Sequence, residues 1–337
     1  MESQSPENTL RIDPEDVEIG WTVAEIRQRL VDGGRPIPRA MLRKMGKDPR
    51  ASVRKLGGLI RRRNETSRIE RSRLRSLLSV ERRLRASGVS SIAGVDEVGV
   101  GPLAGPVVAA AVVFPPGAAI EGVDDSKRLR EKERERLAPV ISERALGVGI
   151  GLADVDEIDQ LNVYQAALLS MKRAVENLPV LPEHILVDAR SIPGLDVPQS
   201  ALRKGDQVSF SIAAASIVAK THRDALMRKL DRRHPEYGFG RHKGYGTPEH
   251  QRAIREHGLL PMHRKSFLSL EEIRGEYSPT FYQLKRELGG VGSEDGLESL
   301  EKKLISCHST LASQETRKLR ILVGRRWQQL RNRHGSG

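Results

Sequence analysis

The chain has 337 residues, of which 38% are hydrophobic and 30% charged, and 57 Lys and Arg against 44 Asp and Glu give a net charge of +13. One cysteine, Cys307, excludes an internal disulfide and a cysteine-based zinc cluster, and the longest apolar stretch, Val107 to Phe114, is shorter than the about 20 residues that a membrane helix needs. Met1 to Asp16 is acidic and polar and shows no secretory signal, so we expect a cytoplasmic protein without a membrane partner.

The positive charge is concentrated in one segment. Residues 41–88 carry 16 basic and 4 acidic side chains, whereas residues 1–40 sum to −3, residues 89–275 to 0 and residues 276–337 to +4. This distribution predicts a basic arm for a polyanion beside a neutral globular body. We therefore expect three parts, namely a helical basic N-terminal extension over 1–88, a globular body over 89–275 and a tail over 276–337.

The extension is predicted to be helical. Thr22 can cap a helix that runs through Leu30, with Glu25 completing a capping box. Asp48 and Pro49 are typical of a second helix start, which Gly57 and Gly58 are expected to interrupt. A further helix is expected over 68–85, followed by a hinge at Ala86 to Ser90.

The body alternates strands with helices. Strands are predicted over 91–98, 107–114, 145–153 and 185–187, and helices over 131–141, 163–178, 211–233 and from Thr247-Pro248 onward. This order predicts an α/β fold with a mixed sheet. In the tail we expect a linker at Gly289 to Gly296 and a helical hairpin over 297–331.

Four acids stand where strands or turns end. Asp96 and Glu97 close the first strand, Asp188 closes another, and Asp206 lies in a turn before the long helix. Neighbouring strand side chains point to opposite faces, so Asp96 and Glu97 share a site only if the strand ends there. Carboxylates without His or Cys partners favour Mg²⁺ or Mn²⁺, and such sites hydrolyse phosphodiesters. Composition alone does not separate these acids from others, which are Asp124, Asp125, Asp154, Asp156 and Asp159.

Seven local strings separate them. In chain order they are Asp96-Glu-Val-Gly-Val-Gly-Pro-Leu-Ala-Gly-Pro-Val107, Asp125-Ser-Lys127, Val187-Asp-Ala189, Lys204-Gly-Asp206, Ser211-Ile-Ala-Ala-Ala-Ser-Ile-Val-Ala-Lys220, His242-Lys-Gly-Tyr-Gly-Thr247 and His263-Arg-Lys-Ser-Phe267. Across about residues 91–274 the chain resembles bacterial ribonuclease HII, in its longer form with an N-terminal extension.

The resemblance implies a ribonuclease H-like catalytic domain over 89–275, a mixed sheet flanked by helices. It implies an endonuclease that hydrolyses the RNA strand of RNA–DNA hybrids, including single ribonucleotides in duplex DNA, by metal-assisted attack of water that leaves 3′-hydroxyl and 5′-phosphate ends. Such an enzyme serves ribonucleotide removal from DNA and RNA primer removal, as a monomer. Asp96, Glu97 and Asp188 are implied to bind Mg²⁺ or Mn²⁺ together with Asp206, and Asp224 is left as a structural or secondary residue.

The resemblance also implies the substrate contacts. Gly99, Val100 and Gly101 offer backbone groups to a closely approaching substrate, and telling RNA from DNA requires contact with the 2′-hydroxyl. Tyr245 is expected to stack on a sugar or base. Phosphates are expected to be bound by Ser126, Lys127 and Lys243. No catalytic role is assigned to His242, His263 or Arg264.

Two features set this chain apart from the shortest family members. The family's turn reads Gly-Arg-Gly, and Val100 stands in place of the arginine, so we expect lower affinity with activity retained. The extension is expected to grip the hybrid backbone electrostatically. The alternatives are a ribonuclease HIII-like enzyme and a catalytically weak hybrid-binding protein, but a protein that only binds has no need for four acids beside a phosphate-rich ligand.

Overall fold

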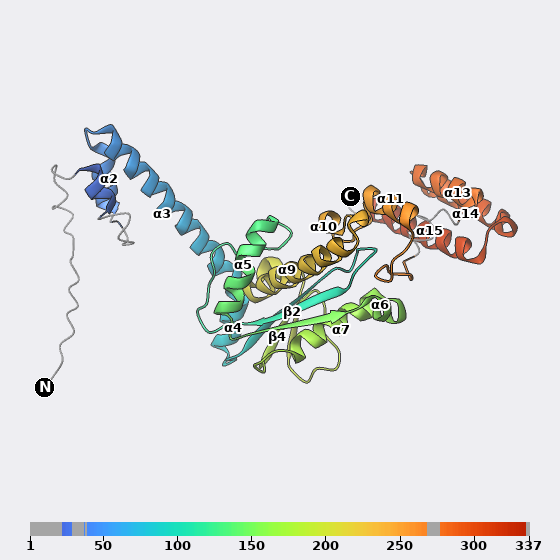
Figure 1. The fold of residues 1–337 in the computed structure, drawn as a ribbon, viewed down its shortest axis with the longest axis horizontal. Helices are drawn as coiled ribbons and strands as arrows, with labels where there is room; N and C mark the ends of the chain where they lie inside the picture. The colour runs from blue at the N-terminus through green and yellow to red at the C-terminus, as the bar shows by residue number, and fades with distance from the viewer. Residues whose placement is uncertain (1–21, 29–36, 38, 268–276, 335–337) are drawn as a thin grey trace. The chain divides into compact units, whose positions relative to one another are not determined.

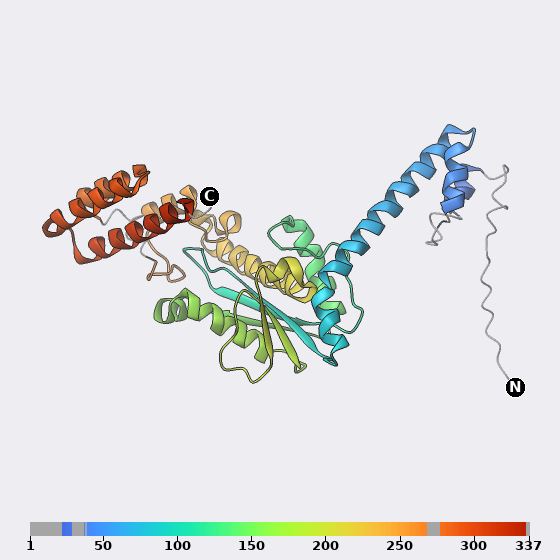
Figure 2. The same cartoon turned by 180° about the vertical axis from the view of Figure 1, so that it is seen from behind.

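The computed structural model describes residues 22–28, 37, 39–267 and 277–334 (Figures 1 and 2). By its internal contacts the chain divides into two compact units, Met1–Ser79 and Val80–Gly337. The principal elements are α1 (Val23–Arg27), α2 (Arg39–Lys47), α3 (Ala51–Leu77), α4 (Ser79–Ala86), β1 (Ile92–Val98), β2 (Val107–Val113), α5 (Glu131–Arg144), β3 (Gly147–Ala153), α6 (Val155–Leu161), α7 (Val163–Glu176), β4 (His184–Asp188), β5 (Gln199–Leu202), α8 (Gly205–Val208), α9 (Phe210–Arg233), α10 (Phe239–His242), α11 (Pro248–His257), α13 (Pro279–Gly290), α14 (Glu294–Ser306) and α15 (Ser313–His334). Within the described ranges no helix is both long and apolar enough to cross a membrane.

The described residues of the first unit include α1, α2 and α3. The predicted capping box is present, because Thr22 Oγ1 accepts a hydrogen bond from the Glu25 amide while the Glu25 carboxylate accepts one from the Thr22 amide. Residues 29–36, where this helix was expected to end, lie outside the described residues. Asp48 does not cap α3 as predicted. Its carboxylate instead accepts hydrogen bonds from Arg50, the residue that precedes the helix.

The expected interruption at Gly57 and Gly58 is wrong, since α3 runs through both residues. The physical reason is close helix packing. A Cβ on Gly57 would lie 2.9 Å from Cβ of Met45 in α2, so the missing side chain lets α2 approach α3. The sequence prediction treated a glycine that permits packing as one that ends a helix.

The second unit is built on a five-stranded mixed sheet in the order β3-β2-β1-β4-β5. β1 is antiparallel to β2 and parallel to β4. The pairs of β1 with β4 end at Val95–Val187, whereas β1 stays paired with β2 as far as Val98–Val108. The last residues of β1 therefore have a strand neighbour on one side only.

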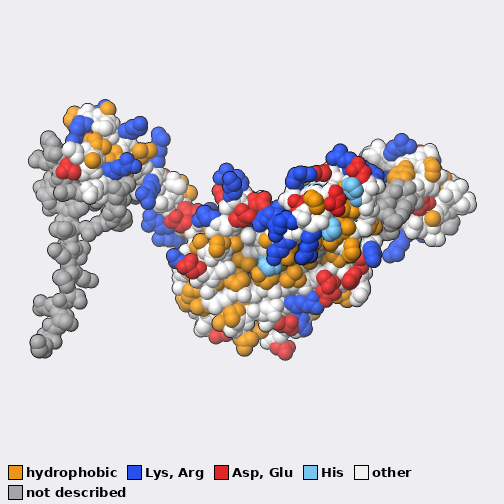
Figure 3. All heavy atoms as spheres, viewed as in Figure 1, with side chains coloured by type: hydrophobic (Ala, Val, Ile, Leu, Met, Phe, Trp, Pro, Cys, Tyr) orange, Lys and Arg blue, Asp and Glu red, His pale blue; other side chains and the backbone are white. Residues whose placement is uncertain are grey.

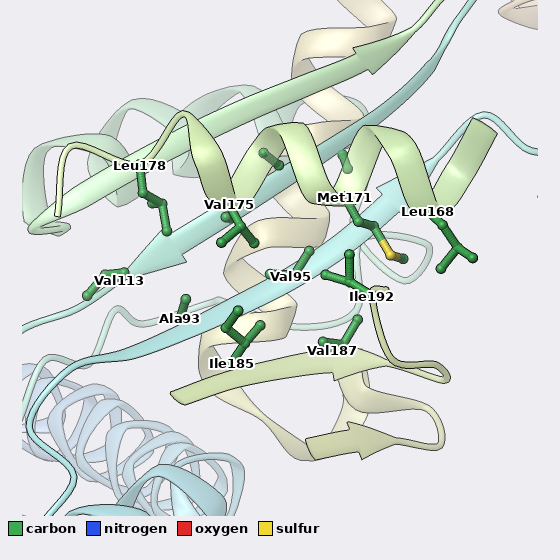
Figure 4. Close-up of a cluster of buried hydrophobic side chains, with 13 residues drawn as sticks. Ala93, Val95, Val113, Leu168, Met171, Val175, Leu178, Ile185, Val187 and Ile192 are labelled. Carbon is green, nitrogen blue, oxygen red and sulfur yellow. The ribbon is translucent and has the colours of Figure 1, made fainter. Parts of the chain in front are cut away.

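A helix covers each face of this sheet, which confirms the predicted α/β class. Ala93 and Val95 of β1 and Ile185 of β4 point toward α7 and form one buried cluster with it (Figure 4). Gly94 faces the opposite side, where a Cβ would lie 2.1 Å from the backbone of Ser211 in α9. This glycine lets α9 lie directly on the strand that carries the acids.

Helix α4 belongs to the second unit through a buried acid. Glu81 is 6% exposed, and its Oε1 accepts hydrogen bonds from Ser209 Oγ at 2.7 Å and from the amide and Oγ of Ser211 at 2.9 and 2.7 Å. It thereby satisfies donors at the start of α9. The division of the chain at Ser79 thus precedes the predicted hinge at 86–90.

The C-terminal helices α13, α14 and α15 share a core that includes Phe281, Leu284, Leu297 and Leu319. The predicted hairpin is present as α14 and α15. The predicted linker is shorter than expected, because Gly289 and Gly290 complete α13 and α14 begins at Glu294.

Candidate active site

The four predicted acids lie close together around the end of β4. Asp188 follows Val187, the residue paired with Val95, so it stands beside Asp96 on the parallel strand. Asp206 lies in α8, whose first amide, that of Gly205, donates to Asp188 Oδ1 at 2.7 Å. The negative charges of Glu97, Asp188 and Asp206 act on the carboxyl group of Asp96.

The condition that β1 must be ending for Asp96 and Glu97 to share a site is met, since β1 ends at Val98, one residue after Glu97. On the β2 side Glu97 is still paired with Ala109. What brings the two acids together is the earlier end of the β1–β4 pairing, which leaves space next to both. The charges of Arg190 and of Asp188, the last residue of β4, consequently act on Glu97.

Crowding and burial work against ionisation of these acids. Burial raises the pKa of Asp96, and the neighbouring Glu97 raises it further. Burial also raises the pKa of Glu97 and of Asp206, and the adjacent Asp125 adds to the effect at Asp206. Lys127 Nζ, 3.6 Å from Asp206 Oδ2, opposes the shift at Asp206.

The donor set fits a hard divalent cation. Glu97 Oε2 is buried and has no hydrogen-bond partner among the described residues. Such an orphaned acceptor, within a cluster of carboxylates whose charges repel, is the environment that a cation stabilises. In the described part of the chain no group of three or more His, Cys, Asp or Glu side chains is arranged to hold a metal as it stands.

A glycine turn follows the acids directly. Gly99 has φ +93°, in the left-handed region, and a Cβ there would lie 2.3 Å from Nε of Arg223. Gly101 is exposed, and a Cβ there would make an ordinary contact of 3.7 Å with Cε1 of Tyr245. Tyr245 is 43% exposed. The turn and the tyrosine ring are therefore neighbours on the surface, as a shared substrate site requires.

The three predicted phosphate contacts differ in their availability. Lys127 extends into solvent, with 80% of its side chain exposed. Ser126 is buried, and its hydroxyl lies 2.8 Å from Ser216 Oγ. Lys243 is also buried, and its Nζ donates to Gly240 O at 2.5 Å and lies 3.2 Å from Glu131. Of the three, Lys127 is the one whose side chain is exposed, so that a phosphate in solution can reach it.

Sequence reasoning missed several residues that shape the site. Asp125 is 4% exposed and accepts hydrogen bonds from the Lys127 amide and from Gln207, so it orders the Lys127 loop. Its place in the Asp125-Ser-Lys127 string was the one signal that set it apart from other acids. Asp224, which the sequence analysis left as a structural or secondary residue, pairs with Lys220 at 2.6 Å and Arg134 at 3.6 Å.

Sequence comparisons with known proteins identify relatives of this chain. The sequence profile of the family described as Ribonuclease HII matches residues 93–270. Ribonuclease HII of Myxococcus xanthus (strain DK1622) is 49% identical over 254 residues, which are 75% of this chain and 87% of that protein. Ribonuclease HII of Geobacillus thermodenitrificans (strain NG80-2) is 48% identical over 260 residues, which are 77% of this chain and 99% of that protein. Among solved structures, ribonuclease H2 from Pyrococcus horikoshii OT3 is 27% identical with a TM-score of 0.49, covering 55% of this chain and 98% of that one. The chain belongs to the ribonuclease HII family.

Proposed function

We propose that this ribonuclease hydrolyses the RNA strand of RNA–DNA hybrids and cuts at single ribonucleotides in duplex DNA. The observation that carries the proposal is that the charges of Glu97, Asp188 and Asp206 all act on Asp96, while an exposed glycine turn next to Tyr245 follows Glu97 in the chain. Acids favour phosphodiester chemistry, and the open turn gives a substrate's sugar access to backbone groups. Family membership supports the same reading.

Asp96, Glu97, Asp188 and Asp206 would hold Mg²⁺ or Mn²⁺. When bound, such cations make water a better nucleophile and neutralise charge on the phosphate. In the net reaction the oxygen of water bonds to phosphorus and the P–O3′ bond breaks. The products are a 5′-phosphate and a 3′-hydroxyl.

The chain's own groups orient this reaction. Gly205 holds Asp188 in place through its amide, and the Asp96 carboxylate accepts from the Glu97 amide at 2.8 Å, which restricts its rotation. Tyr245 offers its ring to the sugar or base next to the cut. Lys127 offers a cation to a flanking phosphate. The amides of Val100 and Gly101 are available to the 2′-hydroxyl.

The proposal is tested by cleavage of a labelled duplex that carries one ribonucleotide. Wild type should cut it only when Mg²⁺ or Mn²⁺ is added, and Asp96→Asn should bind it without cutting. Cutting confined to long hybrids would favour the ribonuclease HIII-like alternative. Binding without metal-dependent cutting by wild type would favour the hybrid-binding alternative.

We further propose that the basic extension holds the substrate backbone. Arg62 and Arg63 are exposed on α3, and Figure 3 shows Lys and Arg side chains along this helix. Neutralising phosphates releases counter-ions, so these contacts should steepen the salt dependence of binding. R62Q/R63Q should reduce the slope of log Kd against log salt by about 1–2. R144Q/K302Q, which removes two exposed charges outside α3, should leave it unchanged.

A truncation that tests the extension should remove residues 1–79 rather than 1–88. The longer deletion would take away Glu81, which binds Ser209 and Ser211. Loss of activity would then reflect damage to the second unit. With the shorter deletion, an unchanged salt slope would reject the role of the extension.

The cellular role follows from the proposed substrates. An enzyme that cuts at ribonucleotides in duplex DNA serves their removal and the removal of RNA primers. We propose that it acts in the cytoplasm as a monomer. Sedimentation of the purified protein, alone and with duplex, tests the oligomeric state.

A further inference from the structure

Two buried arginines lie beneath the glycine turn. Arg223 and Arg264 are both 0% exposed. Asp224, the sequence neighbour of Arg223, gives its oxygens to Lys220 and Arg134. Among the described residues no carboxylate lies within ion-pair distance of either guanidinium. Burying a cation without a counter-ion is unfavourable by several kcal/mol, so both guanidinium groups depend on their hydrogen bonds to other polar groups.

The guanidinium of Arg264 binds the turn by its carbonyl oxygens. Nη2 donates to Gly99 O at 2.6 Å, and Nη1 donates to Val100 O at 3.0 Å. Nε and Nη2 both donate to Gly105 O, at 3.0 and 2.7 Å. The guanidinium carbon lies over the Phe267 ring, 5.2 Å from its centroid, in a cation–π contact.

Arg223 binds the later part of the same segment, residues 104–106. Its Nε donates to Pro106 O at 3.0 Å and its Nη2 to Ala104 O at 3.1 Å. Nη1 donates to Lys243 O at 3.0 Å, which ties this part to the segment that carries Tyr245. The Leu103 amide donates to Gly244 O at 2.8 Å and joins the same two segments again.

The hydrogen bonds to the carbonyl oxygens also determine where the amides of the turn point. No peptide in the described chain is cis, and a trans peptide places its C=O and N–H on opposite sides. Because the carbonyls of Gly99 and Val100 point inward to Arg264, the N–H groups of Val100 and Gly101 point the other way. No described residue accepts a hydrogen bond from either amide. Two donors therefore face outward beside Tyr245.

We propose that Arg264 is a positioning residue for ribonucleotide recognition, which aims the amides of Val100 and Gly101 at the 2′-hydroxyl oxygen, and that Arg223 secures the later part of the same segment. A guanidinium suits this role because its planar fork reaches several carbonyls at once, whereas a lysine ammonium is a single point. The proposal rests on the proposed function, because it assumes a substrate that bears a 2′-hydroxyl.

The test measures selectivity of binding in the full chain. In an Asp96→Asn background, which prevents cleavage, Kd is measured for a duplex with one ribonucleotide and for the same duplex made entirely of DNA. Arg264→Lys should lower the ratio of Kd for DNA to Kd for the ribonucleotide duplex at least fivefold, with Kd for DNA changed less than twofold. Arg173→Lys is the matched control, since Arg173 also donates to a main-chain carbonyl, that of Leu152, but lies away from the turn.

The outcomes separate the proposal from its premise. An unchanged ratio in folded Arg264→Lys, or an equal loss in Arg173→Lys, overturns the proposal. If Arg264→Lys does not fold, Phe267→Leu serves instead, since it removes the ring but keeps the donors, and a ratio lowered at least twofold supports the proposal whereas an unchanged ratio overturns it. Wild type that cuts neither hybrid nor single ribonucleotides would instead overturn the proposed function. Faster amide hydrogen exchange of the 99–105 segment in Arg264→Lys would directly support the claim that Arg264 holds this segment.

Discussion

His250 Nε2 lies 3.1 Å from His263 Nε2, and both rings are fully buried. Their other contacts settle which nitrogen carries the proton. The Leu260 amide, which can only donate, lies 2.8 Å from His263 Nδ1, closer than Leu260 O at 3.2 Å, so we assign the proton to His263 Nε2, which donates to His250. His250 Nδ1 then donates to Tyr245 O at 2.9 Å. A chain of neutral imidazoles thus fixes the backbone of the tyrosine expected to contact the substrate.

We predict that the protein loses stability in mild acid through this chain. Burial lowers the pKa of His250 and of His263 from 6.5 to about 4. Between these values the unfolded chain binds protons that the folded chain rejects, so the free energy of unfolding falls as pH drops from about 6.5 toward 4. The loss should reach up to about 3 kcal/mol for each histidine. Urea unfolding at pH 7.5 and pH 4.5 measures it.

His250→Asn is the control for that experiment. Its amide nitrogen can still donate to Tyr245 O, but it does not titrate. Comparing the two proteins cancels the opposite effect of Asp96 and Glu97, whose raised pKa values favour the fold in acid. The variant should be less stable at pH 7.5 and should show a shallower fall with pH. An identical fall in both proteins would remove His250 from the explanation.

We predict that Asp96→Asn makes the metal-free protein more stable while it abolishes cleavage. The pKa of Asp96 is raised well above 3.8, first by burial and then by Glu97. The folded state is therefore penalised as pH rises above about 4, and a neutral amide escapes the penalty. At pH 7.5 we expect a gain of about 1–3 kcal/mol in the free energy of unfolding. Adding Mg²⁺ or Mn²⁺ should raise Tm of wild type and not of the variant, and a less stable metal-free variant would contradict this account.

We predict that Lys127→Ala weakens substrate binding with little effect on kcat. Its ammonium is exposed and lies next to Asp206, whose charge with that of Asp96 raises the pKa of Lys127 although burial lowers it. Removal of one phosphate contact should raise KM three- to tenfold, or about 1 kcal/mol, and reduce the salt slope by about 1. Lys127→Arg should retain most of the affinity. A fall in kcat with KM unchanged would place Lys127 in the chemical step instead.

We predict that Glu81→Ala destabilises the second unit by about 3 kcal/mol without changing kcat at temperatures well below Tm. The substitution leaves the donors of Ser209 and Ser211 at the start of α9 without their acceptor. Asp154→Ala is the control, because Asp154 caps α6 by the same kind of bond but at an exposed position, where about 1 kcal/mol is expected. Equal losses in the two variants would show that burial of Glu81 adds nothing.

How far the sequence predicts this molecule depends on how local each determinant is. The capping box at Thr22, the strand of Asp96 and the start of α11 at Thr247 are local, and the structure has them where they were expected. The carboxylates were found through strings, since spacing alone did not separate them from acids such as Asp159. Asp159 caps the amides of Lys265 and Ser266.

The determinants that were missed join distant parts of the chain. Arg264 meets Gly99 from across the body, and Glu81 meets Ser211 in the same manner. The sequence near these residues does not indicate the contact, because main-chain carbonyl groups and serine hydroxyls occur throughout the chain. Gly57 shows the converse, since its helix-breaking tendency is local whereas its packing against Met45 is not.

We predict that Val100→Arg lowers KM for a duplex with one ribonucleotide about tenfold and leaves kcat unchanged. Val100 is half-buried and, like Phe267, packs against a buried cluster that contains Val107, so the valine contributes packing where the family has a cation. Its carbonyl, which Arg264 holds, belongs to the backbone and is unaffected by the side chain. A new charge-assisted bond to a phosphate is worth about 1–3 kcal/mol, more than the packing lost at a half-buried site. Val100→Met adds length without charge and should leave KM unchanged. If Val100→Arg and wild type have equal KM at low salt, recognition at this turn depends on the backbone alone.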